Sequence, residues 1–176
     1  MMSEELETII NKLREQGNMD FLEETTEEGI SEFEKDHSIK LPEKYKEWLL
    51  FSDGGELFLP AGCQLYGIEH KPIIDVNSND RPSDDYVIIG ALATGDPILC
   101  EKTGEKIAIY NQEAGRIEDD EIYDDFIAFL TGDTFEFEKC IAKKPLKIKR
   151  KIYKKRWYIT DTSREENNGK KTGKYL

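Results

Sequence analysis

Residues 30–55 read ISEFEKDHSIKLPEKYKEWLLFSDGG, and this stretch determines how the first half of the chain folds. Its apolar residues are spaced as on one helical face, with Ile30 and Phe33 before the proline and Tyr45, Trp48 and Leu49 after it. Pro42 suits the first position of a helix, because its missing N–H would have no partner there. Gly54 and Gly55 can form the left-handed cap that ends a helix. We therefore predict two short helices around Pro42, followed by a strand.

Two further helices are predicted outside this stretch. The first carries the apolar stripe Leu6, Ile9, Ile10 and Leu13 and ends near Gly17. The last carries Ile122, Phe126, Phe129 and Leu130 and ends at Gly132. Thr25 and Glu28 have the spacing of a capping box, which would start the helix that contains Ile30. Gly29 in its first turn weakens that helix by about 1 kcal/mol relative to alanine.

Between the third and the last helix the pattern changes to short apolar runs that are typical of strands. These runs are residues 57–59, 65–68, 86–89, 97–100 and 107–110. Thr103-Gly104 favours a hairpin turn between the last two runs. Residues 71–85 are polar and contain two prolines, so we expect an irregular, exposed segment there with one helical turn. The fold class is α+β, with a largely antiparallel sheet of five to six short strands against N-terminal helices and a closing helix.

The order of these motifs resembles the SUKH superfamily, the Smi/Knr-like proteins. The similarity begins with Phe33-Glu34, Ile39-Lys-Leu-Pro42, the Tyr-Lys and Trp-Leu helix and Asp53-Gly-Gly55. It continues through Leu65-Tyr-Gly-Ile68, Tyr86-Val-Ile-Ile-Gly90, Gly95-Asp-Pro-Ile98, Ile107-Ala-Ile-Tyr110 and Tyr123-Asp-Asp-Phe-Ile-Ala-Phe-Leu130. The resemblance covers residues 3–131. Each motif is a packing signal, so the match depends on their order and spacing.

The resemblance implies a protein-binding module without general catalytic residues. Bacterial members are similar to immunity proteins that neutralise toxins, frequently nucleases, whereas eukaryotic members act as regulatory hubs. Fold transfers more safely than partner identity, because one fold can carry unrelated sites. The leading hypothesis is a non-enzymatic immunity protein of a toxin–antitoxin pair, and the alternative is a regulatory scaffold.

The charge divides the chain into two parts, which we assign as a domain of residues 1–138 and a basic extension of residues 139–176. The domain carries 11 Lys and Arg against 34 Asp and Glu, a net charge of −23. The extension carries 14 basic against 3 acidic residues, a net charge of +11. The acidic domain would repel nucleic acid and attract a basic protein, such as a cognate toxin.

Composition argues against several other classes of protein. No apolar run is long enough to span a membrane and the N-terminus is acidic, so we expect a cytoplasmic protein. Cys63, Cys100 and Cys140 lack the spacing of a zinc site or a disulfide framework. His37 and His70 offer few options for metal binding or a catalytic triad. We predict no cofactor, no metal and no catalytic residue, and the oligomeric state stays open.

Acidic residues are the candidate partner-binding site. The candidates are Asp80, Asp84, Asp85, Glu118, Asp119, Asp120, Glu121, Asp124 and Asp125. Three interpretations apply to them: a solvated surface, a docking surface for a basic partner, or a calcium site. The run 118–121 lacks the alternating ligands and central glycine of an EF-hand loop, which argues against calcium.

Three other features have a functional and a structural interpretation. Trp48, Tyr45 and Phe33 could line a ligand pocket, although aromatic residues at helical spacing are more often core. Glu69 and Lys71 have the acidic-x-Lys spacing of some metal-dependent nucleases, but no acidic strand precedes them.

The basic extension is the third feature. Residues 143–159 mix nine basic residues with Leu146, Ile148, Ile152, Trp157 and Ile159. We expect this segment to dock on the acidic domain as a strand or hairpin, with nucleic-acid binding and contact with a protein partner or another copy of the chain as the alternatives.

Overall fold

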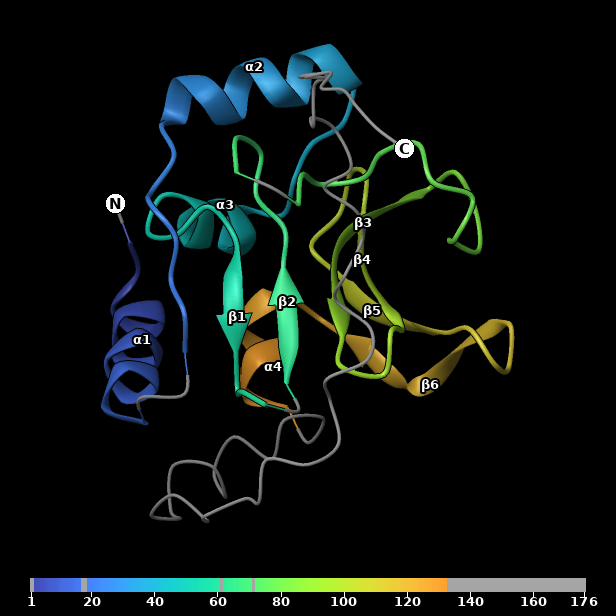
Figure 1. Cartoon of the computed structure of the whole chain (residues 1–176). Helices are drawn as coiled ribbons and strands as arrows, with labels where there is room; N and C mark the ends of the chain where they lie inside the picture. Colours follow the sequence, from blue (N-terminus) through green and yellow to red (C-terminus); the bar gives the residue numbers. More distant parts are fainter. Residues whose placement is uncertain (1, 17–18, 61, 71, 133–176) are drawn as a thin grey trace, which may run out of the picture. The chain divides into compact units, whose positions relative to one another are not determined.

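The computed structural model describes residues 2–16, 19–60, 62–70 and 72–132 (Figure 1). The helices are α1 (Glu4–Gln16), α2 (Glu27–His37), α3 (Glu43–Leu49) and α4 (Phe126–Thr131). The strands are β1 (Gly55–Leu57), β2 (Cys63–Leu65), β3 (Tyr86–Leu92), β4 (Pro97–Glu101), β5 (Ile107–Asn111) and β6 (Arg116–Tyr123). Helices first, then strands, then a helix is the predicted α+β arrangement, which is confirmed.

The six strands form one antiparallel sheet in the order β1-β2-β3-β4-β5-β6, so each strand pairs with its neighbours in sequence. The predicted hairpin is β4 with β5, in which Leu99 pairs with Ala108. Irregularities interrupt the register between β3 and β4 and between β5 and β6. β1 and β6 are therefore the two outer strands of the sheet (Figure 1).

One face of the sheet contributes to the main core. Its residues are Val87, Ile89, Ile98, Cys100, Ile107 and Ile109, which alternate along β3, β4 and β5 as period-two strands require. α4 lies behind β1 and β2 in Figure 1, and its Phe126 packs against Tyr45 and Trp48 of α3 at ring distances of 4.9 and 5.8 Å. Tyr45 and Trp48 are fully buried, so their interpretation as core residues is confirmed.

The predicted stripe of α1 is confirmed, because all four apolar residues are buried in this core. Glu4, Glu5 and Glu7 occupy the first turn, where negative charge stabilises the N-terminus of a helix. The Ser3 N–H donates to the Glu47 carboxylate at 2.9 Å, which ties the start of α1 to α3.

The predicted capping box of α2 is wrong by one residue. Thr26 is the N-cap, and its hydroxyl accepts the Gly29 N–H at 3.0 Å. Thr25 is buried instead and donates its hydroxyl to Glu69 at 2.9 Å. Gly29 has a steric explanation, because an added Cβ would lie 2.7 Å from the same Glu69 carboxylate. The glycine that weakens the helix thus leaves room for a contact with a distant loop.

The boundaries of α3 also differ from the prediction. Pro42 is the N-cap rather than the first helical residue, and Leu50 in an ordinary helical conformation ends the helix. Gly54 and Gly55 do not cap α3. Their φ angles of 99° and 131° form the turn into β1 instead, a conformation that side chains disfavour. Trp48 Nε1–H donates to the Gly54 carbonyl at 3.2 Å, so the helix and the turn are linked directly.

Several strand predictions need correction. β1 ends at Leu57, because Phe58 has a φ of 57° and leaves the extended conformation. β2 begins two residues before the predicted run at 65–68 and shares only Leu65 with it, and no predicted run corresponds to β6. Ile122 belongs to β6 rather than to the closing helix, and it is 45% exposed. The described part of residues 71–85 ends in a single hydrogen-bonded turn, in which the Tyr86 N–H donates to the Ser83 carbonyl at 3.5 Å. The segment is not wholly exposed, because Ile74 and Val76 are buried.

The chain divides into a unit of residues 1–145 and a unit of residues 146–176. All the helices and strands above lie in the first unit. The predicted domain boundary after residue 138 and the predicted docking of residues 143–159 lie outside the described residues. Within the described ranges, no helix is long and apolar enough to cross a membrane.

Candidate functional site

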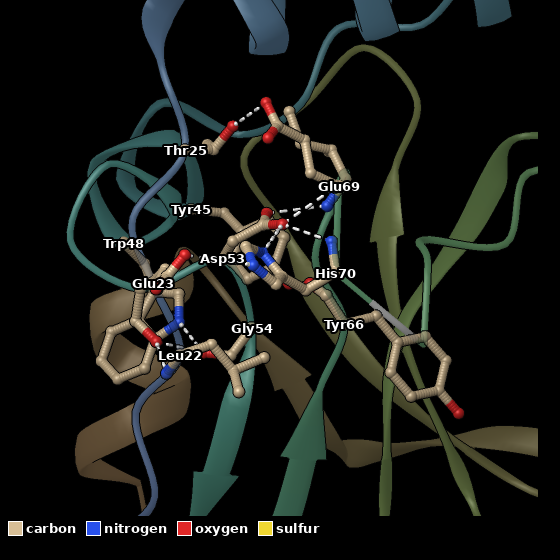
Figure 2. A network of polar contacts seen from close by, with 12 residues as sticks. Leu22, Glu23, Thr25, Tyr45, Trp48, Asp53, Gly54, Tyr66, Glu69 and His70 are labelled. Atoms are coloured by element: carbon tan, nitrogen blue, oxygen red, sulfur yellow. Dashed lines mark hydrogen bonds and ion pairs between the residues drawn. The ribbon is translucent and has the colours of Figure 1, made fainter.

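A network of polar contacts is centred on the Asp53 carboxylate, which lies in the turn after α3 (Figure 2). It is fully buried and accepts the backbone N–H groups of Ile68, Glu69 and His70 at 2.7, 2.8 and 2.8 Å. His70 Nδ1 lies 3.0 Å from the same carboxylate. Gly67 makes this approach feasible, because an added Cβ would lie 2.5 Å from Asp53 Cγ. Buried charge is tolerated when hydrogen bonds satisfy it, as they do here.

Three further contacts extend this network toward the N-terminal segment (Figure 2). His70 Nε2 lies 4.0 Å from the exposed Glu23 carboxylate, and the Asp53 N–H donates to the Glu23 carbonyl at 3.0 Å. Glu69 accepts the Thr25 hydroxyl beside the first turn of α2. The network therefore connects the loop after β2, the turn before β1 and the segment before α2.

The contact of Asp53 with His70 Nδ1 resembles the carboxylate–imidazole pair of acid–base catalysis, in which the other ring nitrogen faces a nucleophile. In the described chain, the group facing His70 Nε2 is the Glu23 carboxylate rather than a hydroxyl or thiol nucleophile. Glu69 of the acidic-x-Lys motif is bonded to Thr25, and Lys71 lies outside the described residues. No cluster of three metal-ligating side chains occurs among the residues that the structure describes. The geometry supports a structural role for this network.

The acidic run of the candidate site lies on β6 and its neighbouring turns. Tyr110 pairs with Ile117 and Ala108 pairs with Ile122, so four residues of β6 face one residue of β5. These four residues are Glu118, Asp119, Asp120 and Glu121. We call them the β6 acidic bulge. A bulge of this kind leaves extra residues outside the regular ladder.

Within the bulge, the Glu121 carboxyl is half-buried and lies near other carboxylates. Partial burial, followed by the negative charges of Asp120, Asp96 and Glu118, raises the pKa of the Glu121 carboxyl above its ordinary value. Its Oε2 atom is buried and has no hydrogen-bond partner among the described residues. Asp96 was not predicted, because it lies in the turn between β3 and β4 and only the folding of the sheet brings it near the bulge.

The other candidate residues lie in different places. Asp80, Asp84 and Asp85 precede β3, whereas Asp96 follows it, so about 20 Å of strand separates the two groups. Asp84 pairs with Arg81 at 2.9 Å. The structure thus brings Asp96 to the bulge and does not bring the loop before β3 there.

The last two candidates lie at the end of β6. Asp125 is the N-cap of α4, where its carboxylate accepts the Ala128 N–H at 2.7 Å. Asp124 is exposed beside it.

A groove of about 330 Å³ lies between α2 and α3. Glutamates line it, but the ammonium of Lys46 lies between Glu34 and Glu43 at 3.4 and 2.9 Å. Glu47 is likewise paired with Lys44 at 3.1 Å. Lysine ammonium groups therefore contact three of the four glutamates that line this groove, although Lys46 is shared between two of them.

Cys63 and Cys100 are buried free thiols, and Cys140 lies outside the described residues. Burial raises the pKa of both thiols far above the ordinary range. The reactive form of cysteine is the thiolate, so neither side chain is suited to nucleophilic chemistry or metal binding.

The described chain is an α+β domain in which three helices precede a sequential six-stranded antiparallel meander and a short helix closes it. The chain belongs to the SMI1/KNR4 family (SUKH-1), which it matches over residues 24–132. The resemblance predicted from the sequence is thereby confirmed, although the match begins after α1 rather than at residue 3. A comparison with curated proteins found no match.

Proposed function

We propose that this protein is an immunity protein that binds a cationic toxin, with nucleases as the foremost class of candidate. Domains of the SUKH family are in general immunity proteins that bind toxins. The observation that carries the proposal for this chain is its charge, a net of −23 over residues 1–138. Such a field accelerates encounter with a positively charged partner and can cover its phosphate-binding cleft.

The arrangement of polar groups supports binding rather than catalysis. The buried Asp53 holds backbone N–H groups, while most candidate acidic side chains lie on the surface. In this proposal the protein binds the toxin in the cytoplasm, where a toxin made in the same cell is synthesised. A regulatory scaffold that binds cellular proteins would use the same surfaces, and gene context distinguishes the two.

The test is binding to the toxin-like protein encoded beside this gene. We expect the full-length protein to protect cells against that toxin and to bind it directly. The association rate should fall about tenfold or more between about 50 and 500 mM NaCl, because salt screens long-range attraction. Stopped-flow fluorescence measures this rate, and the dissociation rate should change much less.

Two results would contradict the proposal. One is a protein that neither binds nor protects against any neighbouring toxin. The other is tight binding of the full chain to single-stranded DNA or RNA at physiological salt, which would favour nucleic-acid binding through the basic extension.

A further inference from the structure

The outer edge of β6 differs from the other edge of the sheet. At β1, Glu56 exchanges two backbone hydrogen bonds of 2.8 Å with Asp20, so the chain itself covers part of that edge. β6 is the last strand of the sheet and spans eight residues. No described strand pairs with its outer side, as Figure 1 shows. An edge strand presents N–H and C=O groups that a second chain can pair with.

The side chains of β6 combine two kinds of surface. Ile122 pairs with Ala108, and its side chain is 45% exposed. The β6 acidic bulge adds four carboxylate side chains, of which Asp119 and Asp120 are exposed and Glu118 and Glu121 are half-buried. Arg116 is paired with Glu118 at 2.9 Å. This edge therefore offers backbone hydrogen bonds, an apolar contact and an excess of negative charge over a short distance.

We propose that the outer edge of β6 binds an extended, positively charged segment of a protein partner, which adds to the sheet as a further strand. This inference rests on the proposed function and identifies the surface and the chemistry of the partner. In such complexes backbone hydrogen bonds supply affinity, while alternate side chains supply specificity. Lysines or arginines of the added strand would face the bulge, and an apolar residue would contact Ile122.

A second copy of this chain fits the same edge poorly. Pairing of two β6 strands about a two-fold axis would bring one acidic bulge against the other. Like charges on neighbouring strands are destabilising, whereas opposite charges stabilise a strand pair. The same charges repel a phosphate backbone. Charge complementarity thus selects a cationic polypeptide.

The test uses the full-length protein and a nine-residue peptide in which lysine alternates with valine. A second peptide with glutamate in place of lysine is the control ligand. We expect the lysine peptide to bind and to slow amide hydrogen exchange in residues 117–123, measured by NMR. The glutamate peptide should do neither. Slowed exchange confined to other residues, or no binding of the lysine peptide, would overturn the proposal.

Two charge-matched variants separate this edge from general attraction. The first combines Glu118→Gln, Asp120→Asn and Glu121→Gln in the bulge. The second combines Glu28→Gln, Glu32→Gln and Asp36→Asn, which are exposed residues of α2. We expect the bulge variant to weaken the peptide affinity by at least about tenfold, and the α2 variant by less than about threefold. Equal losses would overturn the proposal, because they would show non-specific attraction.

Three further outcomes distinguish this inference from the proposed function. If β6 amides of the free protein are already as protected as in the complex, the edge is occupied and the inference fails. If the neighbouring toxin binds both variants equally well, the β6 inference fails while the proposed function stands. If no toxin binds at all, the proposed function fails, and the peptide experiment still decides whether β6 accepts a strand.

Discussion

Replacing Asp53 by alanine should lower the free energy of unfolding by about 3 to 5 kcal/mol, which is a large share of the stability of an ordinary domain. The change removes the acceptor of three backbone N–H groups and the partner of His70 Nδ1. Each buried donor left without a partner costs about 1 to 3 kcal/mol. Water cannot replace the carboxylate freely, because the side chain is fully buried.

Urea unfolding followed by circular dichroism measures this loss. Asp84→Ala is the matched control, because its side chain is 95% exposed and its ion-pair partner Arg81 keeps the backbone carbonyls of Ser78 and Tyr86 as acceptors. The control should change stability by less than about 1 kcal/mol. Asp53→Asn should lie between the two, since it keeps one oxygen acceptor. A loss below about 1 kcal/mol for Asp53→Ala would show that the buried network does not stabilise the fold.

The second large effect is expected for Gly54→Ala, and the chain contains a closely matched control. Gly54 and Gly95 both have a φ of 99°, so alanine is strained equally in this dihedral at the two positions. An added Cβ at Gly54 would lie 2.7 Å from the Leu65 carbonyl oxygen, whereas nothing lies within 4 Å at Gly95. We expect a loss of about 1 to 2 kcal/mol at Gly95 and at least about 3 kcal/mol at Gly54.

Thermal and urea unfolding of the two variants separate backbone strain from steric conflict. The difference between them reports the displacement of β2 that an alanine at residue 54 requires. Trp48 fluorescence gives a second measurement, because its indole N–H donates to the Gly54 carbonyl. Equal losses at the two glycines would contradict the steric explanation.

Apolar spacing predicted the helices well, because burial of one helical face depends only on nearby residues. The stripe of α1 and the buried pair Tyr45 and Trp48 lie where that spacing places them. Cap positions were less accurate. Thr25 and Thr26 could each cap the helix, because both carry the same hydroxyl side chain. In the folded chain Thr25 donates its hydroxyl to the distant Glu69 carboxylate, and Thr26 accepts the Gly29 N–H as the cap.

β6 could not be predicted because its sequence has weak strand character. Charged residues dominate its centre, and aspartate in particular is depleted in strands. Pairing with β5 overrides that preference, and the irregular register removes the alternation that sequence patterns rely on. For the same reason, Ile122 was assigned to the following helix.

The Asp53 network and the β6 acidic bulge show a second reason why sequence patterns do not predict a site fully. Asp53 follows a serine and precedes two glycines, a pattern typical of an exposed turn. Its hydrogen-bond partners lie 15 to 17 residues later, so its burial depends on tertiary structure. The acidic run was found from charge alone, but its neighbour Asp96 is separated from it in sequence and became visible only in the folded sheet.

The sequential order of the strands has a consequence for how the domain folds. Every strand pairs with its neighbour in sequence, and the hairpins from β3 to β6 close loops of four or five residues, which lose little chain entropy, whereas residues 66–85 join β2 to β3. The start of α1 instead depends on a long-range contact, because Ser3 and Glu47 are 44 residues apart in the sequence. We therefore expect β3, β4 and β5 to form the folding nucleus, and α1 to dock after the rate-limiting step.

Folding kinetics of two core variants would test this order. Ile98→Val in β4 should slow folding, with a φ-value above about 0.5, whereas Leu13→Ala in α1 should mainly accelerate unfolding, with a φ-value below about 0.3. Both side chains are fully buried, so both substitutions change stability enough to be measured. The reverse pattern would contradict this order. A meander that assembles first would give the N-terminal segment a finished surface to fold against, and the slowest step of maturation would then belong to the strands.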